Sequence, residues 1–395
     1  MQKKDIYNLI FGRFISNLGF HIANAAVLLF LVEYSREVEI PFVMISSVFG
    51  IFIGNWIVLP RISKYTSRMV LIFGNLFLGI ILLPILIFLM SFGENVLENK
   101  YYFAVFILIV NLFSCLFSAS SQQYLSSHAN ISYLHFDSTM STISRVVSPI
   151  LSMLLLNLNS PFIYIIFLNS IAAFSSALYF KFFFPFDIMS KSEIRNKIVK
   201  YKDIMYLYKK HFSFWAIVIV INIIVSTYNG GVLVHLKQLK IESNVVAVFM
   251  TIQYFSMFLA SIITIKWPIL TRYREIAGIF AGGGLLLIGI GKNIYILSIG
   301  NIILALGMTT LVNGFRSWIA ELPVLDSALK RVYFGQLVFM SSLTNIFGLL
   351  IFSLLIVSYT SWGGLFLYCG AFVLISAFVM QIYAIKKHLV QQNSI

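Results

Sequence analysis

The sequence predicts an all-α, polytopic membrane protein with twelve transmembrane helices in two pseudo-symmetric six-helix bundles. The first observation is composition: 59% of the 395 residues are hydrophobic and 11% are charged, whereas about a quarter of a soluble domain is charged. The second is a series of apolar segments near the length of about 20 residues that a helix needs to cross a bilayer. The third is a short repeat, because "PRISKY" at residues 60–65 returns as "PILTRY" at residues 268–273.

The apolar segments account for most of the chain. In the first half they cover residues 12–34, 42–60, 69–91, 102–124, 139–158 and 161–184. In the second half they cover residues 212–235, 244–265, 275–291, 294–315, 332–357 and 362–385. We therefore predict an amino-terminal bundle at 1–184 and a carboxy-terminal bundle at 212–395. The lysine-rich segment 185–211 between them is predicted to be a basic cytoplasmic linker.

Basic residues are distributed unequally between the two sides of these segments. With the amino terminus inside, twenty-one Lys and Arg residues fall on the inner side and five on the outer side. Cytoplasmic loops carry such an excess, so both termini are predicted to be cytoplasmic and the protein to lie in the cell membrane. The net charge of +14 then reflects topology beside anionic lipid. We expect no nucleic-acid partner.

The repeat agrees with the division into halves. Its two copies fall between the second and third segments and between the eighth and ninth, which are corresponding loops of the two halves. A second internal repeat is found in the first and seventh segments, where polar residues have the same spacing: Asn17, His21 and Asn24, then Asn222, Ser226 and Asn229. Transporters built from duplicated halves place the substrate site between the halves near the bilayer midplane.

The first segment carries a polar face. Arg13, Asn17, His21 and Asn24 are spaced by four, four and three residues, which places them on one side of a helix. At about 1.5 Å per residue, His21 lies about 12 Å beyond Arg13, near the middle of the membrane. Polar side chains at that depth are costly unless they face a cavity or one another, so we expect this face to point inward.

Two residues are candidates for handling protons. The His21 imidazole titrates near physiological pH, although it could equally be a neutral histidine that donates a hydrogen bond to a neighbouring helix. Glu33 is the alternative carrier, or an exposed residue at the outer end of the first segment.

Further polar residues within the segments are candidates for the wall of a substrate cavity, or for ordinary helix packing. They are Asn111, Gln122, Tyr228, Gln253, Tyr254 and Asn313. The chain also has 38 Phe, 20 Tyr and 13 Met. Such residues offer adaptable apolar and aromatic surface, which suits bulky amphipathic or cationic ligands.

Twelve segments in two halves, a basic central linker and a basic loop after the second segment resemble the major facilitator superfamily over essentially the whole chain. The stretch "FGRFISNLG" at residues 11–19 is further similar to the macrolide-type drug-efflux branch. The resemblance implies that the first and seventh helices line a central cavity.

The superfamily's loop motif after the second helix is present in altered form. The resemblance implies that an acidic residue and several basic residues of this motif latch the cytoplasmic side. In this sequence Ser63 stands at the acidic position, Lys64 follows, and Arg68 keeps the last basic position. Arg272 lies in the second copy of the loop. The missing acid puts the charged latch in doubt.

A second motif of the superfamily, typical of exporters, has an analogue in "SRVVSPILSM" at residues 144–153. Ser148, Pro149 and Ser152 keep small residues and a bend where helices approach closely, which is also ordinary helix packing. Arg145 either replaces the arginine that proton-coupled relatives carry in the fourth helix or contacts lipid phosphate.

Acidic residues are conspicuously few within the segments. The carboxylate that many drug antiporters of the superfamily carry after the first-helix glycine is missing, since Phe20 and His21 follow Gly19. We predict that Asp137 lies in a solvated loop, together with His128 and His135, whose spacing fits no familiar zinc site.

These observations predict a secondary active transporter that exports hydrophobic or amphipathic small molecules by alternating access and proton-coupled antiport. The alternatives are an importer of an organic solute and a non-transporting sensor or assembly protein of the same fold. The nearest approach to a nucleotide-binding loop, "GIGKN", lacks the required glycine and hydroxyl residues, so no enzyme is predicted. We expect no cofactor and no metal, and no disulfide between Cys115 and Cys369. The expected partners are membrane lipid, a small-molecule substrate and protons.

Overall fold

The structure, a computed structural model, describes residues 3–34, 39–58, 66–94, 100–128, 131–184, 219, 228, 231–267, 274–321, 343–350 and 362–392. These residues are helical apart from short turns, and the predicted all-α class is confirmed. Seven of the described helices are long and apolar enough to cross a membrane. The predicted linker 185–211 and both copies of the loop motif, except Arg68, lie outside the described residues.

Each amino-terminal helix corresponds to a predicted segment, although α1 and α6 begin nine and eight residues earlier than predicted. They are α1 (Lys3–Tyr34), α2 (Glu39–Ile53) with a π-helical continuation η1 (Gly54–Val58), α4 (Ser67–Phe92), α5 (Lys100–His128), α6 (Ile131–Leu156) and α7 (Pro161–Phe183). The carboxy-terminal helices are α11 (Ser243–Lys266), α12 (Arg274–Ile290), α13 (Ile294–Glu321) and α15 (Trp362–Gln392). Of the predicted segments 212–235 and 332–357, the structure describes helical residues mainly at 231–238 and 343–350.

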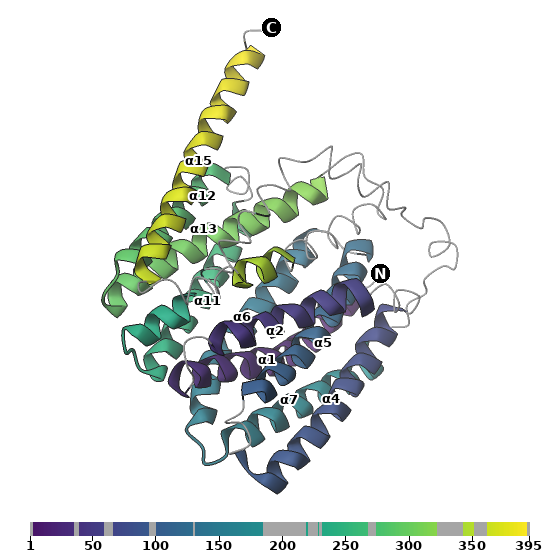
Figure 1. Cartoon of the computed structure of the whole chain (residues 1–395). Helices are drawn as coiled ribbons and strands as arrows, with labels where there is room; N and C mark the ends of the chain where they lie inside the picture. The colour runs from purple at the N-terminus through teal and green to yellow at the C-terminus, as the bar shows by residue number, and fades with distance from the viewer. Residues whose placement is uncertain are drawn as a thin grey trace.

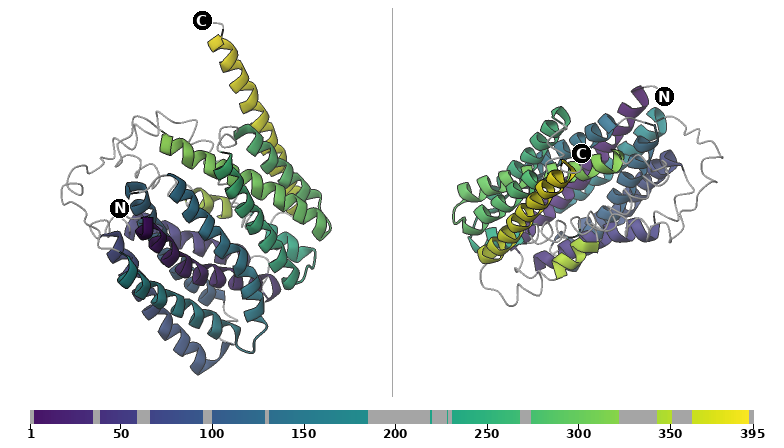
Figure 2. Two further views of the ribbon diagram at one scale, coloured as in Figure 1. Left: turned by 180° about the vertical axis from the view of Figure 1, so that it is seen from behind. Right: turned by 90° about the horizontal axis from the view of Figure 1, so that it is seen from above.

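The described helices form two groups that lie side by side (Figures 1 and 2). Helices α1 to α7 pack on one another, and in the other group α13 packs on both α12 and α11, with α15 packed on α12. The two groups meet where α11 packs against α6 and, over a smaller area, against α1. Among the described helices, a site shared by both groups is therefore expected where α11 meets α6 and α1.

Helix α1 is the central element of the amino-terminal group. It contacts α2, α5, α6, α7 and α11. In its most apolar stretch 67% of the residues are buried, the largest share of the seven candidate spans. A helix surrounded in this way cannot turn polar side chains toward lipid, so its polar face must meet other helices or a cavity.

Glycines provide close helix contacts of two kinds. At some positions an aromatic ring covers the glycine: a Cβ added to Gly12 would meet the Phe180 ring at 2.5 Å, and one added to Gly74 would meet the Phe117 ring at 2.5 Å. At other positions the backbones of two helices touch, as Gly50 of α2 does with the Leu108 carbonyl of α5. A Cβ added to Gly284 of α12 would lie 2.4 Å from the Leu304 backbone nitrogen of α13. Small residues permit such approach between membrane helices.

A side chain from another helix end caps the start of α7. The side chain of the N-cap residue Ser160 makes no capping hydrogen bond. Instead the Ile163 backbone N–H donates to the Glu94 Oε1 at 2.9 Å, from the turn that follows α4. A carboxylate at this position also complements the positive end of the helix dipole. Burial raises the pKa of Glu94, while hydrogen bonds from the Ile163 and Phe162 backbones lower it by less.

We expect Glu94→Ala to lower the free energy of unfolding by about 1 kcal/mol, the usual value of an N-cap. Glu94→Gln keeps an acceptor oxygen and should cost less. The pKa of Glu94 in the folded state lies above its ordinary value. The stabilisation that comes from the protonated carboxyl is therefore fully present below the ordinary pKa, and it is lost as the pH rises through the raised pKa.

Melting temperatures of the detergent-solubilised wild type and the Gln variant, measured from about pH 4 to about pH 8, check this expectation. The wild type should lose stability relative to the Gln variant as the pH rises. A difference between them that stays constant over this range would contradict the burial of the carboxyl group.

Candidate functional site

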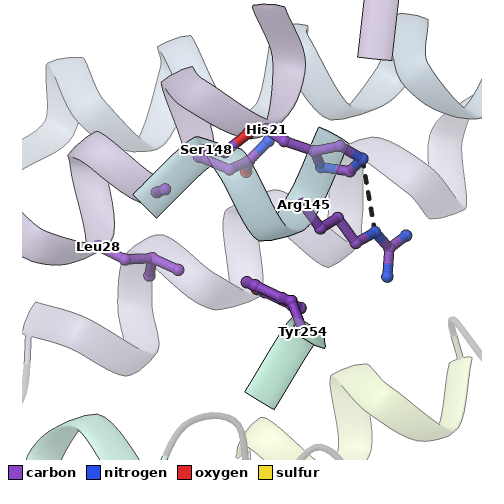
Figure 3. A pocket seen from close by; sticks show the side chains of 7 residues that line it. His21, Leu28, Arg145, Ser148 and Tyr254 are labelled. Atoms are coloured by element: carbon purple, nitrogen blue, oxygen red, sulfur yellow. Dashed lines mark hydrogen bonds between the residues drawn. The ribbon is translucent and has the colours of Figure 1, made fainter. Parts of the chain in front are cut away.

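A small polar cavity lies where the two groups of helices meet. It has a volume of about 30 Å³ and is lined by His21, Asn24, Ala25 and Leu28 of α1, by Arg145 and Ser148 of α6, and by Tyr254 of α11 (Figure 3). A water molecule needs about 10–15 Å³ measured in this way, so the space holds one or two waters. An organic molecule requires the helices to move apart.

His21 and Arg145 form the polar centre of the cavity. The Arg145 Nε donates to the His21 Nε2 at a distance of 3.4 Å (Figure 3). Because the guanidinium is always a donor, the accepting Nε2 must be unprotonated, which makes His21 a neutral imidazole in this arrangement. At 3.4 Å the hydrogen bond is long and weak, so it leaves Arg145 available to another acceptor.

Small polar residues hold α1 against α6 behind this pair. The Ser152 hydroxyl of α6 donates to the Ile22 carbonyl of α1 at 2.9 Å, and the Ser148 hydroxyl donates to the Ser144 carbonyl within α6. Ser148, Pro149 and Ser152 are all buried. The predicted close-packing face therefore exists, and it is also the face that brings Arg145 to His21.

Asn24 continues the wall toward α5. Its Oδ1 accepts a hydrogen bond of 2.9 Å from the Asn111 Nδ2, and its own Nδ2 donates to the Phe20 carbonyl. The Asn111 Nδ2 also donates to the Ile107 carbonyl. Asn111 thus orients a wall residue without lining the cavity itself.

Arg13 is occupied by a partner that the sequence analysis placed wrongly. Its Nη1 donates to the Asp137 Oδ2 in an ion pair, with 5% of the Arg13 and 8% of the Asp137 side chain exposed. Asp137 was predicted to lie in a solvated loop, but α6 begins at Ile131 and buries it. Arg13 is consequently separate from the cavity wall, and Asn17, the residue of the polar face between Arg13 and His21, is also buried.

The sequence did contain a pattern that places Asp137 on the polar face of a helix. Asp137, Ser141, Arg145 and Ser148 follow one another at spacings of four, four and three, so the polar face of α6 extends a full two turns before Ser144. A lone arginine inside an apolar helix also requires an anionic partner at the same depth. These two observations together point to an Arg13–Asp137 pair.

Of the predicted cavity residues of the carboxy-terminal group that the structure describes, Tyr254 lines the cavity, and Tyr228, Gln253 and Asn313 do not. The Tyr228 hydroxyl donates to the buried Asn301 Oδ1, and the Asn313 Nδ2 donates to the Thr264 Oγ1 at 2.8 Å, so both pairs join helices. Gln253 is half-buried on α11 beside Tyr254. Asn222, Ser226 and Asn229 lie outside the described residues, as does the Gln122 side chain.

The other proton candidate is remote from the cavity. Glu33 is exposed in the last turn of α1, more than three turns beyond His21. Its position agrees with the interfacial alternative.

One residue of the predicted loop latch is described. The Arg68 Nη2 donates to the Lys181 carbonyl of α7 at 2.6 Å, so Arg68 joins two helices of the amino-terminal group. Ser63, Lys64 and Arg272 lie outside the described residues.

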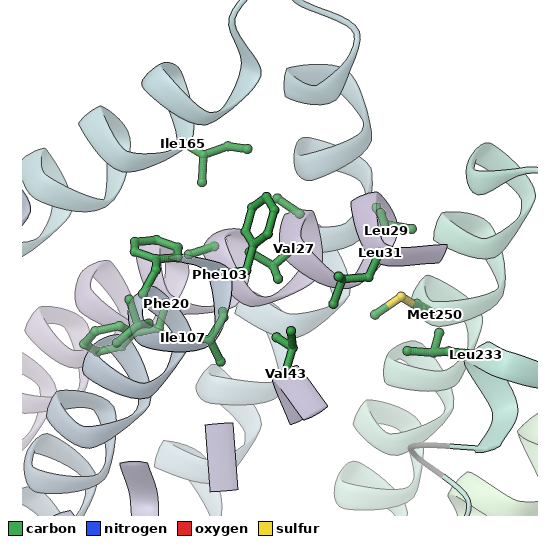
Figure 4. Close-up of a cluster of buried hydrophobic side chains, with 14 of the residues drawn as sticks. Phe20, Val27, Leu29, Leu31, Val43, Phe103, Ile107, Ile165, Leu233 and Met250 are labelled. Carbon is green, nitrogen blue, oxygen red and sulfur yellow. The ribbon is translucent and has the colours of Figure 1, made fainter. Parts of the chain in front are cut away.

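An apolar cluster lies where the carboxy-terminal end of α1 meets the second group of helices. Leu29 and Leu31 of α1 lie close to Leu233 and to Met250 of α11 (Figure 4). The Lys237 Nζ also donates to the Val32 carbonyl, which adds a polar contact between the two groups. The sequence analysis did not find these contacts, because they depend on how two separate sets of helices are placed.

No protein-family model matches the sequence, and no curated protein sequence matches it. Solved transporter structures do match in three dimensions. The xylose transporter XylE from E. coli, in a partially occluded inward-open conformation, has a TM-score of 0.69 at 14% identity, covering 96% of this chain and 98% of that one. The nucleoside transporter NupG has a TM-score of 0.66 at 11% identity, with 95% and 99% covered. The human organic anion transporter MFSD10 has a TM-score of 0.62 at 12% identity, with 94% and 99% covered.

The chain has the major facilitator superfamily fold. The resemblance of the sequence to this superfamily implied that the first and seventh helices line a central cavity. In the superfamily fold seen here, α1 supplies four of the seven wall residues, and α6 and α11 supply the rest. The expectation is thus met for the first helix, α1. Most of the seventh predicted segment lies outside the described residues.

Proposed function

We propose that the protein is a secondary active transporter that moves a small organic solute by alternating access, with the cavity around His21, Arg145 and Tyr254 as its binding site. The observation that carries the proposal is that polar side chains from both groups of helices line one cavity. His21 lies within one turn of the midpoint of α1, and therefore near the middle of the membrane. Substrate sites of transporters with duplicated halves lie at this depth, between the halves.

The apolar cluster of Leu31, Leu233 and Met250 supports alternating access, because we take it to be the outer closure of the cavity. In the predicted orientation the carboxy-terminal end of α1 faces outward, so this cluster and the Lys237 contact separate the cavity from the outside. A transporter must be able to close one side while the other opens. The division into duplicated six-helix bundles, 1–184 and 212–395, remains part of the proposal.

The class of cargo follows from the wall. Tyr254 and Leu28 offer aromatic and aliphatic surface, while Arg145, His21 and Asn24 offer hydrogen-bonding groups. Such a combination suits an organic solute with one polar end. The similar structures belong to transporters of xylose, nucleosides and organic anions, which supports small organic solutes as the class.

Two directions of transport have separate support. Export of amphipathic molecules by proton antiport rests on the residues 11–19 stretch and the small-residue face of α6, as inferred from the sequence. The basic side chains of the wall favour the second direction, uptake of an organic solute. Arg145 would repel a cationic drug, which counts against drug export.

The site is tested by comparing Tyr254→Ala with Phe255→Ala. The two aromatic residues are adjacent on α11, but Tyr254 lines the cavity while 48% of Phe255 is exposed on the lipid side. Purified protein in proteoliposomes would be given an imposed pH gradient of either sign and a panel of labelled sugars, nucleosides, organic anions and amphipathic dyes.

We expect flux of at least one class in the wild type and in Phe255→Ala, and a reduction of about tenfold or more in Tyr254→Ala, as the loss of one good aromatic contact implies. Equal flux in both variants would remove the cavity from the mechanism. Absence of flux for the whole panel, with correctly folded protein, would contradict transport.

A further inference from the structure

We propose that the cavity binds an anionic group of the transported solute between Arg145 and His21, and that a proton binds at His21 together with that anion. The inference rests on the proposed transport function and names the substrate class and the coupling at the same site. The chemistry is that of a carboxylate or phosphate on a small organic molecule.

The cavity wall carries positive charge without a matching negative one. Arg145 is its one permanently charged member among the seven wall residues, and no carboxylate lines the cavity. The only buried carboxylate among the described residues is Asp137, which is already paired with Arg13. The amino-terminal group therefore contains two inward-facing arginines and one buried acid.

The Arg145 guanidinium is free to take an anion. Among the described residues its one hydrogen-bond partner is His21, through Nε. The two terminal nitrogens point away from the imidazole (Figure 3). A guanidinium binds carboxylates and phosphates through two parallel hydrogen bonds, and these are strengthened where water is excluded. A cation near mid-membrane without a counter-charge is costly in free energy. An anionic ligand beside Arg145 would supply the counter-charge and lower this cost.

The surroundings of His21 connect anion binding with proton binding. The groups that face it are Arg145 of α6 and Tyr254 of α11, with the neutral Asn24 and Ser148 beside them. Arg13, two turns earlier on α1, adds a more distant positive charge that Asp137 balances. No described acid faces the imidazole.

A proton added to His21 in the empty cavity would place two cations 3.4 Å apart. An anion held by Arg145 would lie beside both cations and offset this repulsion. By linkage, the anion then favours proton binding and the proton favours anion binding to the same extent. Ligands that bind together move in the same direction, so this site favours proton-driven uptake over antiport.

The experiment compares small aromatic probes that differ in charge. Binding of benzoate and phenyl phosphate to the purified full chain, and of the neutral benzamide, would be measured by titration calorimetry in wild type, Arg145→Gln, His21→Gln and Lys181→Gln. Lys181 is exposed on α7 outside the cavity, so its variant removes the same charge without touching the wall.

We expect the wild type and Lys181→Gln to bind at least one of the two anions in preference to benzamide, and Arg145→Gln to bind it about tenfold or more weakly, because a charge-assisted hydrogen bond is lost. Anion addition to the weakly buffered wild type should cause proton uptake, and in His21→Gln this uptake should be lost while anion binding persists. Equal melting temperatures would show that the variants are folded.

Preference for benzamide, absence of anion binding, or unchanged anion binding in Arg145→Gln would overturn the proposal. Proton release on anion binding would overturn its coupling. An anion could also come from a lipid headgroup, so binding is repeated in phosphatidylcholine vesicles with and without phosphatidylglycerol. Loss of soluble-anion binding in the presence of phosphatidylglycerol would assign the site to lipid instead. Tyr254-dependent flux of neutral or cationic solutes without anion binding would leave the transport function standing while removing this inference.

Discussion

Replacing Arg13 by methionine should lower the free energy of unfolding by about 3–5 kcal/mol, one of the largest effects of a single substitution in this chain. The side chains of Arg13 and Asp137 are 5% and 8% exposed, and each supplies the other's counter-charge. Removing the guanidinium leaves the Asp137 carboxylate uncompensated inside the membrane. Asp137→Asn should cost a similar amount, because it leaves the arginine without its anion.

The double variant Arg13→Met/Asp137→Leu separates charge pairing from packing. Removing both charges often restores stability, since neither group then has to be desolvated. We expect the double variant to melt at a higher temperature than either single variant in detergent, which gives a large coupling free energy in a double-mutant cycle.

Lys4→Met is the matched control, because it removes an exposed charge from the same helix. It should change the melting temperature little. Additive effects of the two single substitutions, or a single variant as stable as the wild type, would contradict the ion pair.

Substitution of Gly284 by alanine should be the second severe change, with a loss of about 3 kcal/mol, at the upper end for overpacking. The added Cβ would lie 2.4 Å from the Leu304 backbone nitrogen and 2.6 Å from the Gly300 carbonyl oxygen. Both are backbone atoms of α13, so no side chain can turn aside, and α12 and α13 would have to separate along their contact.

The neighbouring Gly283 provides an unusually close control. A Cβ added there meets nothing within 4 Å. Gly283→Ala should therefore leave stability unchanged or raise it by up to about 1 kcal/mol, the difference between glycine and alanine in a helix. Thermal unfolding and the yield of monodisperse protein check both variants. Similar behaviour of the two would show that the α12–α13 contact is looser than the structure places it.

Sequence reasoning succeeded where a single helix decides the outcome. Apolar length predicted the described membrane helices, because each must satisfy its backbone within itself. The spacing of His21 and Asn24 placed both on an inward face, and both line the cavity. Tyr254 was among the candidates for the same reason, as a polar-ended ring in an apolar segment.

Sequence reasoning failed where the partner lies on another helix. The residues before 139 appeared too polar for a membrane helix, yet α6 includes them because Arg13 of α1 neutralises Asp137. Arg145 was interpreted as a replacement for the fourth-helix arginine or as a contact to lipid phosphate, since nothing in its own segment shows that His21 lies beside it. Hydropathy measures one helix at a time, whereas these roles arise from contacts across 124 residues.

The contact that Lys237 makes with Val32 uses a carbonyl of the last turn of α1. Helix ends leave such carbonyls without partners inside the helix. Lys237 consequently binds the main chain, and the isopropyl group of Val32 takes no part in this hydrogen bond. Among homologues, the apolar residue at position 32 should be set by core packing alone, while position 237 should keep a long basic side chain for the contact, an asymmetry of evolutionary constraint across one and the same contact.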